Sequence, residues 1–465
     1  MIERIEHRGM LIKECSIPGE TRADEVYPSH PNGTQVSRDK FLLVYATRGF
    51  RGTDDDRSTV YQLREGGFDG RLIKEGILGR STDDWEPLED GVHYVREHGS
   101  PAVFGVPRGA CTNGKPAPHA NLFVIRWRQQ ARRLDPATGL MLHMDKTPAA
   151  LGVATDAVLW TQVRLNEAEN DIEVVQAPRI LRQRGFASGY AFCEAGATTM
   201  MHGAQPVPYN REGTQWIEMA WFVTLLPGMS AAKRERAVSM GALLHEFNFR
   251  SGLYEWMRTG ALTAGAFFEP NILPYKDGWV VCARERDSAR PSRGLPVPWW
   301  RTDDPFAPLP DPVRPVQPRT TAPILAYRCP DGGVRMVTTD SWQSTTADLR
   351  EPLHCIEVDP DRGFAMVNRH LVFDGFASGL PIRRESIPSI DMGKILPHSG
   401  GDTQYLLHRV RPTSTKDPAR TGHRVNQAEM DASAIYCATI HYDRAYRGPW
   451  TFTSGSVQEH KARGI

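Results

Sequence analysis

The sequence lacks the patterns that mark membrane and nucleic-acid-binding proteins. No apolar run approaches the roughly 18 residues of a membrane-spanning segment. The chain has 56 basic and 55 acidic residues, and its formal net charge of +1 creates no global field to attract nucleic acid or anionic lipid. We therefore expect neither nucleic acid nor membrane as a partner, while the oligomeric state stays open.

Paired cysteines and cofactor motifs are absent as well. The seven cysteines are scattered and form no C-x-x-C pair, which argues against a disulfide framework or a zinc knuckle and favours a reducing compartment. The charged start of the chain, residues 1–8, has no apolar core of the kind found in signal peptides, so a cytoplasmic location is expected. Phosphate loops, dinucleotide fingerprints and the G-x-S-x-G elbow are missing, so no cofactor is expected.

Short β-rich runs dominate the sequence. Residues 41–47, 58–63 and 71–78 are rich in residues that favour strands, and they are separated by an acidic turn at 53–56 and a glycine-rich turn at 66–70. This spacing predicts an antiparallel meander, and similar meanders recur to a last strand at 434–441. The helical period is nearly absent, with residues 231–244 as the only plausible helix.

Weak internal repeats indicate radial repetition of one unit. Asp-Gly hairpin turns recur at Asp69-Gly70, Asp277-Gly278 and Asp331-Gly332. Repeated four-stranded sheets around an axis remove the exposed edges of a long all-β chain. We predict an all-β protein: a single β-propeller domain over residues 1–465, with six four-stranded antiparallel blades and a proline-rich excursion at 287–323.

The segment 269–286 carries the sharpest chemical pattern. Glu269 begins an apolar strand, Asp277-Gly278 reverses the chain, and Arg284 ends the returning strand, with Arg286 just beyond it. This arrangement resembles the sialidase superfamily; residues 25–285 are loosely similar to a divergent member of it, and the rest of the chain is similar only in its general style of strands and turns. The resemblance implies that Glu269 polarises a nucleophilic tyrosine, and that Arg284 grips a substrate carboxylate with Arg286 nearby.

The opening blade resembles the same family. A stretch ending in His30 precedes the strand 40–47, which is followed by Arg48 and by three acids at 54–56. The resemblance implies that one of the three acids Asp54, Asp55 and Asp56 is the acid/base catalyst, with Asp55 as our choice, and that Arg48 and His30 contact substrate. His30 stands where the family has its first arginine, which indicates a sugar other than ordinary sialic acid.

Two further family positions have several candidates. The third substrate-binding arginine could be Arg350, Arg362 or Arg369, and the best candidate for the nucleophile is Tyr405. Three segments with a Ser/Thr-Asp pattern after a strand, such as residues 81–85, are similar to degraded Asp-boxes that lack the usual glycine.

Other segments suggest competing functions. His119 precedes a strand that ends at residues 126–128, and His143 lies on the returning strand of the same hairpin. This segment resembles propeller-fold polysaccharide lyases, in which a histidine or tyrosine transfers protons and an arginine or histidine neutralises the carboxylate of a uronate. Arg384, with its neighbours Arg383 and Glu385, is a candidate for contacts with sugar hydroxyls. Three functions therefore remain open: an exo-acting glycoside hydrolase, a polysaccharide lyase on uronates, and a propeller that only binds glycans.

A metal site is not expected. His398, Asp402 and His408 lie close in sequence, but their spacing matches no standard ligand pattern.

Overall fold

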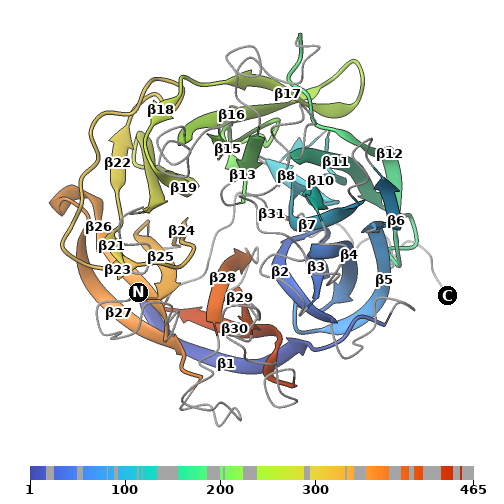
Figure 1. Ribbon diagram of the computed structural model, residues 1–465, viewed down its shortest axis with the longest axis horizontal. Coiled ribbons are helices and arrows are strands. Elements are labelled where there is room, and N and C mark those ends of the chain that lie inside the picture. Colours follow the sequence, from blue (N-terminus) through green and yellow to red (C-terminus); the bar gives the residue numbers. More distant parts are fainter. Residues whose placement is uncertain are drawn as a thin grey trace.

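The computed structural model forms a ring of six antiparallel sheets around a central axis (Figure 1), which confirms the predicted all-β propeller and its blade number. The structure describes residues 1–16, 26–49, 56–80, 82–87, 93–112, 115–117, 119–133, 156–185, 199–202, 205–223, 238–286, 294–329, 332–339, 352–375, 389–396, 403–411, 431–443 and 451–452. Within these residues, no helix has the length and apolar character needed to span a bilayer.

The first blade shows why these sequences form propeller strands. It is built from β2 (Val26–Gln35), β3 (Lys40–Gly49), β4 (Asp56–Glu65) and β5 (Arg71–Gly79), paired in chain order. In β3 the run from Phe41 to Tyr45 is at most 1% exposed. Neighbouring blades cover both faces of the sheet, so this central strand is a continuous apolar run without polar alternation.

Five further blades complete the ring. The second contains β6 (Thr82–Pro87), β7 (His93–Val106), β10 (Leu122–Arg133), β11 (Asp156–Leu165) and β12 (Ile172–Ile180). The third contains β13 (Thr199–His202), β14 (Val207–Pro208), β15 (Gln215–Val223), β16 (Val238–Asn248), β17 (Leu253–Thr259) and β18 (Thr263–Ala264). The fourth contains β19 (Phe267–Tyr275), β20 (Gly278–Glu285) and β22 (Trp299–Thr302). The fifth contains β24 (Leu325–Arg328), β25 (Val334–Thr339), β26 (Leu353–Asp359), the 3-10 turn η4 (Pro360–Arg362) and β27 (Ala365–Phe373).

The sixth blade closes the ring by pairing the first strand of the chain with strands from its C-terminal part. Its strands β28 (Ser389–Leu396), β29 (Thr403–Arg411) and β30 (Ala434–Tyr442) are followed by β1 (Ile2–Ile12), which pairs along β30 from Ile2 opposite Tyr442 to Ile12 opposite Ile435. Short strands outside the blades are β8 (Ala110–Thr112), β9 (Lys115–Pro116), β21 (Leu295–Pro296), β23 (Arg319–Thr320) and β31 (Thr451–Phe452).

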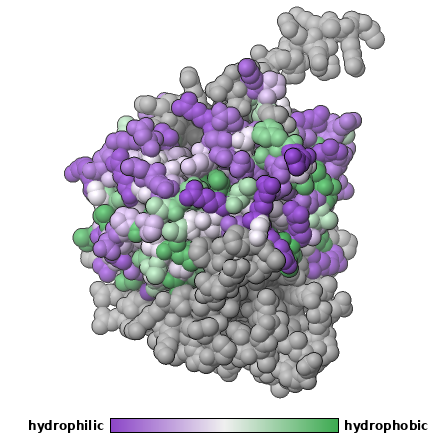
Figure 2. All heavy atoms as spheres, turned by 90° about the horizontal axis from the view of Figure 1, so that it is seen from above, coloured by the Kyte–Doolittle hydropathy of each residue, from purple (hydrophilic) through white to green (hydrophobic). Residues whose placement is uncertain are grey.

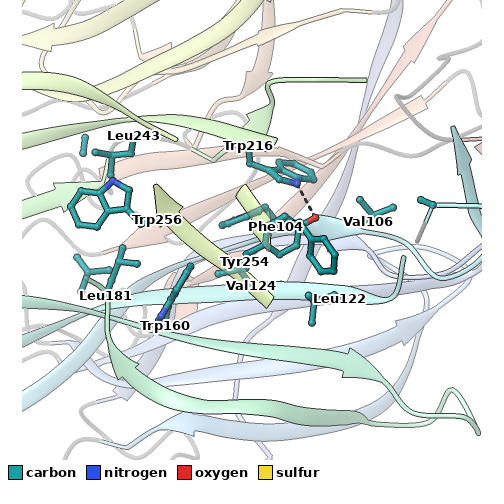
Figure 3. Packing of buried hydrophobic residues seen from close by; sticks show 14 of the residues in the cluster. Phe104, Val106, Leu122, Val124, Trp160, Leu181, Trp216, Leu243, Tyr254 and Trp256 are labelled. Atoms are coloured by element: carbon teal, nitrogen blue, oxygen red, sulfur yellow. Dashed lines mark hydrogen bonds between the residues drawn. The ribbon is translucent and has the colours of Figure 1, made fainter. Parts of the chain in front are cut away.

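Apolar clusters between adjacent blades hold the ring together. Figure 3 shows the cluster between the second and third blades, which includes Trp160, Trp216 and Tyr254; the Trp216 indole donates to the Tyr254 hydroxyl at 3.3 Å. The visible surface is mostly hydrophilic with scattered apolar residues (Figure 2), as expected once the large aromatic side chains are buried.

Strand direction gives the propeller two distinct ends. Val26, at the start of β2, pairs with Gly49 at the end of β3, and Phe267 of β19 pairs with Glu285 of β20 in the same way. We call this end, where the inner strands begin, the site end. The opposite end, marked by the turn Gly66–Gly70 between β4 and β5, is the turn end. The inner strands β2, β7, β13, β19, β24 and β28 lie nearest the centre of Figure 1.

Two sequence expectations need correction. The only plausible helix, residues 231–244, is wrong where the structure describes it, because Val238–Asn248 forms β16 in register with both β15 and β17. The proline-rich stretch 287–323 is more than an excursion between strands, since Trp299–Thr302 forms β22, the third strand of the fourth blade. Packing of Trp299 and Trp300, both at most 1% exposed, fixes this strand despite the flanking prolines.

Candidate functional site

The hairpin formed by β19 and β20 brings Glu269 and Arg284 together at the site end. Arg284 Nη2 donates to Glu269 Oε1 at 3.0 Å, and Arg284 Nη1 donates to the carbonyl of Thr321 at 3.1 Å. The Glu269 side chain is 23% exposed and the Arg284 side chain is 15% exposed, so the ion pair is largely shielded from water but accessible to a ligand. The second carboxylate oxygen, Glu269 Oε2, is buried and has no hydrogen-bond partner among the described residues.

The backbone at Glu269 is strained. Its φ is +50°, an uncommon value for a residue with a side chain, and proline at position 270 normally favours an extended conformation in the residue before it. The register jumps here from Phe268 opposite Arg284 to Asn271 opposite Cys282, so Glu269 and Pro270 form a β-bulge. A bulge redirects a side chain out of the regular alternation of the strand.

Asn271 fastens this bulge to the next blade. Its Nδ2 donates to the carbonyls of Glu269 and Ile324, both at 2.9 Å, and its Oδ1 accepts from the backbone nitrogen of Ala326 at 3.2 Å. Asn271 is 1% exposed, so these bonds are made away from water. The strained glutamate is therefore held by the packing of two blades, and not by its own loop.

His30 lies on the inner strand of the first blade in the same backbone setting. Its φ is also +50°, it precedes Pro31, and the register jumps from Ser29 opposite Ala46 to Asn32 opposite Val44. Asn32 Oδ1 accepts from the backbone nitrogen of Val103 on β7 at 3.3 Å, as Asn271 does from the fifth blade. The first and fourth blades thus repeat one structural device.

An arginine that the sequence did not single out lies against His30. Arg409 of β29 donates through Nη1 to Ser29 Oγ at 2.7 Å and to His30 Nε2 at 3.0 Å. A guanidinium can only donate, so Nε2 must accept, and the proton of the neutral ring then sits on Nδ1. The sixth blade therefore supplies a guanidinium beside the position where the opening blade has histidine in place of arginine.

The remaining residues predicted near this end are only partly described. Arg286 is exposed just beyond β20, with its guanidinium 5.9 Å from the centre of the Phe268 ring. Arg48 of β3 pairs along the backbone with Tyr27 and Asp56 at the site end. Asp55 lies outside the described residues, as does its neighbour Asp54, but the flanking residues Gly49 and Asp56 are both at the site end.

Tyr405, the predicted nucleophile, is not brought to Glu269. It lies at the turn end, opposite Leu396 at the end of β28, and its ring packs edge-on against Phe68 at 5.5 Å between centroids. Burial, together with the nearby Asp69 carboxylate, raises the pKa of its hydroxyl to about 12. A tyrosine in this setting resists ionisation, and its contacts explain it as a packing residue between the sixth and first blades.

His119 is not brought to the site end either. It precedes β10 at the turn end, is 2% exposed, and packs against the Phe247 ring at 5.4 Å and the Tyr254 ring at 6.4 Å. Burial lowers its pKa, which favours a neutral ring inside the aromatic cluster. His143, its predicted partner, lies outside the described residues.

The other arginine and metal candidates do not converge on Glu269 within the described chain. Arg362 lies in η4 at the turn end, and Arg369 is exposed on the outer strand β27. His408 is fully buried against Phe373 and Tyr436, and burial lowers its pKa to about 3. No group of three metal-ligating side chains occurs in the part of the chain that the structure describes. Candidates outside the described residues are Arg350, Arg383, Arg384, Glu385, His398 and Asp402.

Comparison with known proteins identifies the architecture. No family model and no curated protein matches the chain. A protein of unknown function from Dyadobacter fermentans superposes with a TM-score of 0.56 at 9% identity, covering 95% of this chain and 100% of its own. The Trypanosoma rangeli sialidase superposes with a TM-score of 0.50 at 9% identity, over 97% of this chain and 58% of the sialidase. This chain therefore spans little more than half of that sialidase, and it has the propeller fold of the sialidases, as the resemblance in its sequence predicted.

Proposed function

We propose that this protein is a carbohydrate-active enzyme, an exo-acting glycoside hydrolase of sialidase-like type that acts on a sugar other than ordinary sialic acid. The observation that carries the proposal is the Glu269–Arg284 pair. It stands at the site end of an inner strand, in a strained bulge fixed by Asn271. Strain of about 1–3 kcal/mol at a polar residue persists only where neighbouring structure imposes it, and such residues concentrate at functional sites.

The proposed chemistry divides between the two groups of the pair. The Glu269 carboxylate has one oxygen held by Arg284 and a second oxygen without a described donor, so it can accept a proton or a hydrogen bond from a reacting hydroxyl. Arg284 presents a rigid fork suited to a carboxylate or to sugar hydroxyls. Asp55 remains our proposal for the acid that protonates the leaving group. Tyr405 lies at the turn end of the propeller, the end opposite Glu269, so we do not propose it as the nucleophile.

Arg409 and His30 support a substrate different from sialic acid. The guanidinium beside the first blade is 1% exposed and donates to Ser29 and His30, so it is engaged by the protein and not presented as an open carboxylate fork. The lyase alternative depended on His119 and His143 with a tyrosine and an arginine, and the position of His119 in an aromatic cluster does not support it. A binding-only propeller is the second candidate, since the same bulges can hold a glycan without cleaving it.

A substrate panel tests the proposal. The protein is incubated with 4-methylumbelliferyl glycosides of neutral sugars, of hexuronic acids and of N-acetylneuraminic acid, and released fluorophore is measured. Glu269→Gln should abolish release while leaving the melting temperature close to that of the parent, because the amide oxygen can still accept from Arg284. The matched control, Glu173→Gln, removes an exposed ion pair with Arg164 on the second blade and should keep full activity.

Two results would contradict the hydrolase. Release of fluorophore that survives in Glu269→Gln would remove that glutamate from the mechanism. Polyuronate degradation with a rise in near-ultraviolet absorbance would show an unsaturated product, and the lyase would replace the hydrolase.

A further inference from the structure

The second blade repeats the bulge that holds Glu269 and His30, and it places a serine at the equivalent position. Ser100 has a φ of +51° and precedes Pro101. The register jumps from Gly99 opposite Arg128 to Ala102 opposite Arg126, so Ser100 and Pro101 together face Trp127 alone. The same count, two residues on the inner strand against one on the next, occurs at His30-Pro31 and at Glu269-Pro270.

These three residues occupy the same level of the propeller. Each is the first residue of a bulge on the inner strand of its blade, five or six residues before that strand ends, and the inner strands β2, β7 and β19 lie nearest the axis (Figure 1). Blades one and two are neighbours, and blade four lies across the ring from blade one. A ligand held near Glu269 over the axis therefore lies between it and the other two positions.

The asparagine contact does not explain the strain by itself. In blades one and four an asparagine follows the proline and binds the backbone of the next blade, so the bulge could serve only to place Asn32 and Asn271. In blade two the residue after Pro101 is Ala102, which has no side-chain donor or acceptor, yet the strained serine is kept. The feature common to all three bulges is a polar side chain at positive φ before proline.

We infer that Ser100 is a further ligand-binding residue, forming with Glu269 and His30 a ring of three polar groups that contact one sugar near the axis. This inference rests on the proposed function for the site at Glu269. Ser100 is partly exposed, and its hydroxyl can donate to or accept from a sugar hydroxyl, which suits a neutral or weakly charged face of the ligand. Its role is binding and specificity, not proton transfer.

Replacing Ser100 with glycine separates strain from ligand contact. Glycine adopts positive φ without the steric cost of a Cβ atom, so Ser100→Gly should raise the melting temperature of the ligand-free protein by about 1 °C. The same variant loses the hydroxyl. We expect kcat/KM for the glycoside chosen from the panel to fall about tenfold or more, with most of the change in KM.

Lys276→Gly is the matched control. Lys276 also has a φ of +50°, but it lies in the turn between β19 and β20 at the turn end, where its ammonium bonds Asp361 at 2.6 Å. Glycine relieves the same backbone strain there, and the exposed ion pair contributes little, so activity and sugar binding should equal those of the parent.

Sugar binding is measured in parallel by the melting-temperature shift with L-arabinose, D-glucuronate, D-galacturonate and N-acetylneuraminate. Parent-like KM and sugar shifts in Ser100→Gly would overturn the inference while leaving the hydrolase intact. Sugar binding without turnover, lost in Ser100→Gly and kept in Lys276→Gly, would support the ring and refute the hydrolase. A parent protein that neither binds nor cleaves any of these sugars would overturn both.

Discussion

A buried polar triad joins the second and third blades and gives the sharpest test of how this propeller is held together. Glu218 of β15 accepts from Arg126 Nη2 at 2.5 Å and shares a hydrogen bond with His245 Nε2 at 2.7 Å. The three side chains are 0%, 3% and 0% exposed. Arg126 lies on β10 opposite Ala102, the residue that follows the bulge of β7. The residues at the equivalent positions of blades one, four and six are Val44, Cys282 and Leu407. Charge here replaces an apolar contact used elsewhere in the ring.

Removing the Glu218 carboxylate alone should lower the free energy of unfolding far more than replacing both Glu218 and Arg126 with apolar residues. Glu218→Gln keeps the volume but removes the carboxylate that accepts from the Arg126 guanidinium in a site closed to water, and we expect a loss of about 3–5 kcal/mol in the free energy of unfolding. The double variant Arg126→Met with Glu218→Leu restores an apolar interface like that of the other blades, and should recover more than half of that loss. In the double variant His245 loses its hydrogen bond with Glu218, and this accounts for about 1 kcal/mol of the remaining loss in the free energy of unfolding.

Urea unfolding followed by tryptophan fluorescence measures both variants. Glu173→Gln, which breaks an exposed pair whose side chains are 59% and 45% exposed, is the control and should lose less than about 1 kcal/mol. If the double variant is as unstable as Glu218→Gln, the desolvation reasoning is refuted and the triad stabilises the interface in its own right.

Two further predictions concern stability. Burial lowers the pKa of His408 to about 3, below its ordinary value near 6.5, so below pH 6.5 the unfolded chain binds a proton at this histidine and the folded chain does not. The contribution of His408 to the free energy of unfolding should therefore be fully present above pH 6.5 and fall by about 1.4 kcal/mol per pH unit below it. His408→Phe should lose about 2 kcal/mol less than the parent between pH 7 and pH 5 in urea titrations, and an equal loss would contradict this. Deleting residues 1–13 removes β1 and exposes the edge of β30, so the shortened chain should unfold without cooperativity. Adding a peptide of residues 1–13 should restore the cooperative transition. If the shortened chain alone unfolds cooperatively at the midpoint of the parent, closure of the ring by β1 is unnecessary.

Local patterns in the sequence were sufficient for the blades and for one hairpin of the site. Apolar runs such as residues 41–47, with Asp-Gly turns between them, predict antiparallel strands because turn chemistry and strand period are local properties. The Glu269–Arg284 contact was predictable for the same reason, since a tight turn fixes which residues of its two strands are neighbours. The repeat of His30-Pro31-Asn32 in Glu269-Pro270-Asn271 was also present in the sequence, and it is the signal that could have indicated the equivalent bulges.

Only the tertiary structure decided which distant residues meet. The order of blades around the ring sets Arg409 against His30 across 379 positions of sequence, and strand direction sends Tyr405 and His119 to the turn end, away from Glu269. The equivalence of Ser100 with Glu269 depends on the register of each inner strand, which is fixed by pairing with the next strand and by packing against neighbouring blades. Composition and turn signals determined that this chain is a propeller; the packing of its blades determined which polar groups share an end of it, because contacts between blades join segments whose separation along the chain carries no local signal.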